Sequence, residues 1–81
     1  MDKITDKVYN FKTKNKEGFI SNEIDILLKD YPNININKFN EALMGITGIL
    51  KDGEFVYFHS DIIKALSCGV ENRDLQSWEW D

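Results

Sequence analysis

The stretch GILKDGEFVYFH, residues 48–59, constrains the fold more than any other part of the chain. Two runs of β-branched and aromatic residues meet at Asp52-Gly53, a dipeptide that favours a two-residue type I′ turn because both positions accept positive φ. A turn of this kind predicts a β-hairpin and fixes the residue pairs across its strands: Lys51 with Glu54, Leu50 with Phe55, Ile49 with Val56, and Gly48 with Tyr57.

The predicted hairpin carries apolar residues on both of its faces. Strand alternation divides them into two sets: Ile49, Val56 and Phe58 on one face, and Leu50, Phe55 and Tyr57 on the other. Only one face can cover the core of so small a domain, and large apolar patches rarely stay bare. The other face therefore needs a cover, for which the sequence offers three alternatives: Trp78 or Trp80 of the C-terminal tail, a second copy of the chain in a homodimer, or a partner protein.

Apolar residues recur at helical spacing in four other segments. They predict helices over about residues 3–12, 22–30 and 36–46, and a fourth helix that starts at Ser60 or Asp61. Ser21 and Asn35 offer N-caps for the second and third helices, and Gly69 suits the C′ position of the fourth. Between the first two helices, Phe19 and Ile20 predict a brief strand.

The segment NININKFNEALMGI allows two interpretations, because the alternation of Asn and Ile over residues 33–37 is also typical of a strand. Helical spacing of the apolar residues and the Asn35 cap favour a helix, with residues 33–35 as a tight turn. The residues expected to face the core are Ile36, Phe39, Leu43 and Ile46. Those expected to face outward or to the flanks are Asn37, Lys38, Asn40, Glu41, Met44 and Gly45.

The predicted order of elements resembles a winged helix-turn-helix domain over residues 3–69. The matching stretches are GFISNEIDILL, INKFNEALMGITGIL and KDGEFVYF. The resemblance implies an α+β fold, with a winged-helix-type three-helix core, a short β-hairpin wing and a fourth C-terminal helix. Residues 1–70 would form this domain, and residues 71–81 an acidic tail that contains two Trp.

In that family the third helix usually reads the DNA major groove, and the wing often touches the backbone or the minor groove. The resemblance therefore implies a transcription regulator with DNA contacts on the third helix: Asn37, Lys38, Asn40, Glu41 and Met44. Residues 1–16, with five Lys and two Asp, provide the best phosphate anchors, at Lys12, Lys14 and Lys16 together with Lys3 and Lys7.

The charge balance favours a protein partner instead. The chain has a net charge of −4, and its predicted wing tip holds one Lys and two carboxylates, which suits a minor groove poorly. The alternative function is thus a protein-binding module or a modulator of a host complex. Its candidate partner-binding residues are Leu50, Phe55, Tyr57, Trp78 and Trp80.

Residue types for catalysis or metal binding are scarce. His59, Ser60 and Asp61 are consecutive, so their side chains cannot converge as a catalytic triad. One His and one Cys do not make a zinc site, Cys68 has no disulfide partner, and the sequence contains no P-loop or dinucleotide motif. We expect a non-enzymatic protein without cofactor or metal.

The amino-acid sequence also predicts the cellular location of the protein and the kind of organism that encodes it. The chain has no apolar signal segment and no apolar run long enough to span a bilayer, which predicts a cytoplasmic protein without membrane contact. Nine Lys against one Arg, with many Asn and Ile, indicates AT-rich coding. That bias is typical of a low-GC bacterium or a phage, and a phage protein would act in the host cytoplasm.

Overall fold

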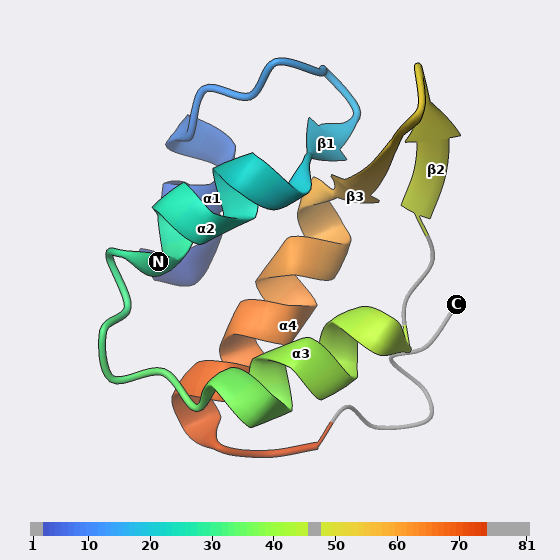
Figure 1. Ribbon diagram of the computed structural model, residues 1–81. Coiled ribbons are helices and arrows are strands. Elements are labelled where there is room, and N and C mark those ends of the chain that lie inside the picture. The colour runs from blue at the N-terminus through green and yellow to red at the C-terminus, as the bar shows by residue number, and fades with distance from the viewer. Residues whose placement is uncertain (1–2, 46–47, 75–81) are drawn as a thin grey trace.

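The computed structural model describes residues 3–45 and 48–74, which form an α+β fold (Figure 1). Its elements follow in the order α1 (Lys3–Asn10), β1 (Gly18–Phe19), α2 (Ser21–Leu28), α3 (Ile36–Met44), β2 (Gly48–Lys51), β3 (Glu54–Phe58) and α4 (His59–Glu71). The predicted layout of three helices, a β-hairpin and a fourth helix is confirmed. The two Trp of the predicted tail lie outside the described residues.

The sheet is antiparallel, with strand order β1-β3-β2. The register of β2 against β3 is the predicted one, from Gly48 opposite Tyr57 to Lys51 opposite Glu54. Asp52 and Gly53 have φ values of 51° and 83°, as a type I′ turn requires. The dipeptide at the turn therefore determines the hairpin, as the sequence predicts.

The predicted strand at residues 19 and 20 is one residue out of place. β1 pairs Gly18 with Phe58 and Phe19 with Tyr57, and Ile20 instead occupies the N-cap of α2. Ser21 is the first helical residue, so its predicted N-cap role is wrong. The Glu23 carboxylate explains the shift: its Oε1 accepts the Ile20 N–H at 3.0 Å, so the helix start is stabilised without a hydroxyl cap.

α4 extends past Gly69, which the sequence predicts as the residue after the helix. Asn72 ends the helix instead, in the left-handed conformation with φ 55°. Gly69 is buried inside the helix, and a Cβ at this position would lie 2.5 Å from Ile34 Cγ1. The glycine thus serves the close approach of the α2–α3 connection rather than the helix end.

The core lies between the helices and the sheet. Its fully buried side chains come from every helix, and the largest are Phe19, Phe39, Leu27, Ile62 and Leu66. Cys68 is buried, as expected for a small apolar residue. The predicted core face of α3 is partly wrong, because Ile36 is 45% exposed whereas Ala42 is buried. Ile46 lies outside the described residues.

A set of polar contacts joins the start of α3 to the end of α4. The Asn35 N–H donates to the Gly69 carbonyl at 3.0 Å, and Asn35 Nδ2 donates to Asn72 Oδ1 at 2.6 Å. Lys38 Nζ lies 2.7 Å from Asp74 Oδ1. We call these five residues the α3–α4 clasp. In Figure 1 these helix ends meet at the lower left.

Candidate binding surfaces

The outer face of α3 is the first predicted DNA-contact set. Asn35 caps this helix, since its Oδ1 accepts the N–H groups of Asn37 and Lys38 at 3.1 and 3.2 Å. The exposed residues of the predicted set are Asn37, Asn40, Glu41 and Met44. This face therefore presents two amides, a thioether and one carboxylate.

Lys38 differs from the rest of that set. It is half-buried, and its ammonium donates to Asp74, which raises the pKa of Lys38. α3 contains no other cation. The only positive charge of the predicted recognition helix is thus neutralised within the chain.

The hairpin tip is also unsuited to a nucleic-acid groove. Lys51 Nζ lies 3.1 Å from Glu17 Oε1. The Glu17 carboxyl has a lowered pKa, chiefly through a hydrogen bond from its own backbone N–H and then through Lys51. Asp52 and Glu54 remain exposed at the tip. Carboxylates at this position repel phosphates, whereas minor-groove contacts use cations.

The second predicted DNA-contact set, Lys12, Lys14 and Lys16, is exposed on the loop between α1 and β1. The carboxylate of Glu23 anchors this loop, since its Oε2 accepts the Lys14 N–H at 2.7 Å. No ion pair among the described residues involves these three lysines. The loop runs along the top of Figure 1 and α3 lies near the bottom, so the structure separates the two predicted DNA-contact sets.

The outer face of the hairpin carries two of the exposed large apolar side chains. Leu50 is 75% exposed and Phe55 42% exposed. The Phe55 ring lies 4.9 Å from the Tyr57 ring, and Tyr57 packs against the core. We call Leu50, Phe55 and Tyr57 the hairpin patch. The predicted covering residues Trp78 and Trp80 lie outside the described residues.

A second apolar surface was not predicted from the sequence. It is a groove of about 350 Å³ between α2 and α3 that reaches Tyr57 of β3. Its lining residues are Ser21, Ile24, Asp25, Leu28, Ile36, Phe39, Asn40, Leu43 and Tyr57. We call it the α2–α3 groove. An exposed Ile36 would indicate this groove, but the helical spacing of the apolar residues predicts that the Ile36 side chain is buried in the core.

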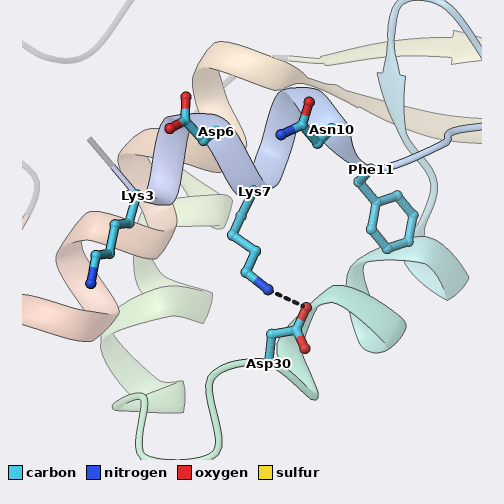
Figure 2. Close-up of a pocket in the computed structure, with 6 residues that line it drawn as sticks. All are labelled: Lys3, Asp6, Lys7, Asn10, Phe11 and Asp30. Carbon is cyan, nitrogen blue, oxygen red and sulfur yellow. Dashed lines mark hydrogen bonds and ion pairs between the residues drawn. The ribbon is translucent and has the colours of Figure 1, made fainter. Parts of the chain in front are cut away.

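A larger cleft of about 520 Å³ lies beside α1 (Figure 2). Lys3 and Lys7 alternate there with Asp6, and Lys7 Nζ lies 3.5 Å from Asp30 Oδ2 on the facing segment. Both partners of this ion pair are about half exposed. Two cations and two carboxylates balance in this cleft, so it has no charge preference for a ligand.

The His59-Ser60-Asp61 segment opens α4. The His59 ring stacks on Tyr9 at 5.3 Å and meets Phe19 edge-on at 5.3 Å. Ser60 is exposed, whereas Asp61 is buried, so these two side chains do not share a surface. Within residues 3–45 and 48–74, no three His, Cys, Asp or Glu residues are grouped to hold a metal ion.

Comparisons with protein-family models, with curated proteins and with solved structures find no match for this chain. Across the described part of the chain, no helix has both the length and the apolar character needed to cross a bilayer. The functional inference therefore depends on the chemistry of three of the surfaces above: the loop that carries Lys12, Lys14 and Lys16, the hairpin patch and the α2–α3 groove.

Proposed function

We propose that this chain is a small, non-enzymatic winged-helix-type protein that binds a partner protein through its hairpin patch. The exposure of Leu50 and Phe55 on adjacent positions of paired strands is the observation that carries the proposal. The Phe55 ring packs on Tyr57, and an aromatic side chain that is already packed loses less conformational entropy on binding, which favours it as an interface anchor.

Electrostatics supports a protein over DNA as the partner. Phosphate contacts supply most of the affinity for DNA, and they require unpaired cations on the contacting face. Lys38 on α3 is paired with Asp74, and Lys51 on the hairpin is paired with Glu17. The surface around the hairpin patch thus offers carboxylates and apolar groups, which suit a protein surface.

Quantitative affinity capture tests this function. The immobilised full-length chain is compared with a Leu50→Ser/Phe55→Ser double variant and with Val70→Ser, a matched control whose side chain is 49% exposed on α4. Loss of an interface anchor costs more than about 1 kcal/mol, so recovery of the partner is expected to fall at least about fivefold in the double variant and to stay constant in the control. Equal recovery by all three proteins would remove the hairpin patch from the function.

The predicted tail residues are tested in the same capture experiment. A Trp78→Ala/Trp80→Ala variant keeps the whole chain and removes both indole rings. If these residues contact the partner, recovery decreases as it does in the hairpin variant. Unchanged recovery would restrict the partner site to the hairpin.

A second candidate function, contact with the DNA backbone, is favoured by one observation: Lys12, Lys14 and Lys16 are exposed and have no ion-pair partner among the described residues. Three phosphate contacts predict a slope of about −3 in a plot of log affinity against log salt concentration. A triple Lys→Gln variant is expected to lose that slope. Absence of duplex binding at low salt would exclude this function.

A further inference from the structure

α2 and α3 are not close partners in this fold. α3 packs mainly against α4, whereas α2 contacts β1. In Figure 1, α3 crosses in front of α4, whereas α2 lies in front of α1. The α2–α3 groove opens between them, so its two walls are helices and Tyr57 of β3 contributes to its lining.

The lining of the groove is apolar and already shaped. Ile24 and Phe39 are buried, and Leu28, Leu43 and Tyr57 are half-buried. Ile36, at 45% exposure, stands at the rim on α3. A channel between two helices accepts the side-chain ridge of a third helix, and amphipathic helices bind such grooves through anchors at i, i+3, i+4 and i+7.

The charge of the groove selects among such helices. Asp25 is the only charged residue in the lining, and the other polar residues there are Ser21 and Asn40. The charged residues of α3, Lys38 and Glu41, are outside the lining, and Lys38 is turned to Asp74. A ligand with Lys or Arg beside its apolar ridge would meet the Asp25 carboxylate at this groove, whereas an acidic side chain at the same place would be repelled by it.

We propose that the α2–α3 groove binds an amphipathic helix of a partner protein, with an apolar ridge flanked by Lys or Arg. This inference rests on the proposed function, that the chain binds a protein, and it names the class of partner. Tyr57 belongs to both the groove and the hairpin patch, so the two surfaces form one continuous apolar area. A helix in the groove would orient its protein toward the hairpin patch.

Peptide selection against the immobilised full-length chain tests the proposal. The probe is a display library of helical peptides about 18 residues long, a length at which isolated helices begin to be populated. Leucines are fixed at i, i+3, i+4 and i+7, and the flanking positions are randomised among Lys, Glu, Gln and Ser. The selected peptides are expected to be enriched in Lys and depleted of Glu beside the ridge.

Affinities of a selected peptide for variants of the chain, measured by fluorescence anisotropy, then locate its site. Ile36→Ser and Asp25→Lys are each expected to weaken binding about tenfold. Ile26→Ser is the matched control, because Ile26 is 47% exposed on α2 and lies outside the groove lining. Circular dichroism confirms that each variant is folded.

The other outcomes overturn the proposal. They are enrichment of Glu beside the ridge, failure to select any peptide, and binding that is insensitive to Ile36→Ser. A peptide that responds to Leu50→Ser alone would refute the groove and leave the hairpin function standing. Self-association of the chain that Ile36→Ser abolishes, measured by sedimentation, would assign the groove to a second copy instead.

Discussion

Substitution of Gly18 by alanine is expected to break the pairing of β1 with β3. An alanine Cβ at this position would lie 2.6 Å from the Tyr57 carbonyl carbon and 3.0 Å from Phe58 Cα, whereas ordinary contacts begin at 3.4 Å. Both neighbours are backbone atoms of the central strand, so no side-chain rotation relieves the overlap. The strands must therefore separate by at least about 0.8 Å, which weakens the hydrogen bonds between them.

The loss of stability can be worked out from Phe19, the residue that follows Gly18. Phe19 is fully buried and is held in place by this pairing. Complete loss of a buried Phe side chain costs about 3–5 kcal/mol, and we expect displacement of Phe19 to cost about 3 kcal/mol. A core of this size leaves a net stability of about 3–5 kcal/mol, so the variant should be close to half unfolded in the weaker case.

Thermal unfolding followed by circular dichroism measures the effect. For a domain of this size, about 3 kcal/mol corresponds to a Tm decrease of about 12–24 °C. Gly53→Ala is the control, because Gly53 has φ 83° and no atom within 4 Å of an added Cβ, which leaves only backbone strain of about 1 kcal/mol. A Gly18→Ala protein with a Tm within about 4 °C of the native chain would refute the steric reasoning.

Three further substitutions test other parts of the structure. Asn35→Ala removes the cap of α3 and the hydrogen bond to Asn72, and is expected to lower stability by about 1 kcal/mol in urea unfolding; an unchanged midpoint would contradict the cap. Above pH 4.5 the native chain is expected to have a higher Tm than Glu17→Gln, because the pKa of Glu17 is lowered in the folded state. The difference in Tm should disappear as the pH falls through that lowered pKa. A difference that does not depend on pH would contradict the ion pair of Glu17 with Lys51. Leu50→Ser is expected to change the free energy of unfolding by less than about 0.5 kcal/mol, since Leu50 is mostly exposed, and a larger loss would show that this residue belongs to the core.

Features set by neighbouring residues could be predicted from the sequence. Asp52 and Gly53 determine the turn by their own φ preferences, and the register of the hairpin follows from it. Asn35 caps α3 as predicted, because the cap needs only the two N–H groups that follow it. Both of these features involve residues within a few positions of each other.

Features set by distant contacts could not be predicted. A glycine such as Gly69 is typical of the position after a helix end. Here its lack of a side chain instead leaves space for Ile34, which comes from another part of the chain. Ile36 fits the helical pattern of a core residue, yet Ala42 takes the buried position, because the packing of α3 on α4 sets its rotation. Periodicity alone gives small residues such as alanine too little weight to find this face.

Of the candidate surfaces, too, one could be predicted from the sequence and one could not. The hairpin patch could be predicted, since strand pairing fixes which side chains share a face. The α2–α3 groove could not, because it depends on where the fold places two helices that contact other elements. The ion pair between Lys38 and Asp74 could not be predicted either, because the two residues are 36 positions apart in the sequence.

The α3–α4 clasp has a consequence for folding kinetics. Its contacts join residues that are 34 to 37 positions apart, so they require closure of a long loop. Such contacts form after the transition state in chains that fold through local structure first, and their removal mainly accelerates unfolding. The clasp is therefore expected to contribute more to how long the native state persists than to how fast it is reached.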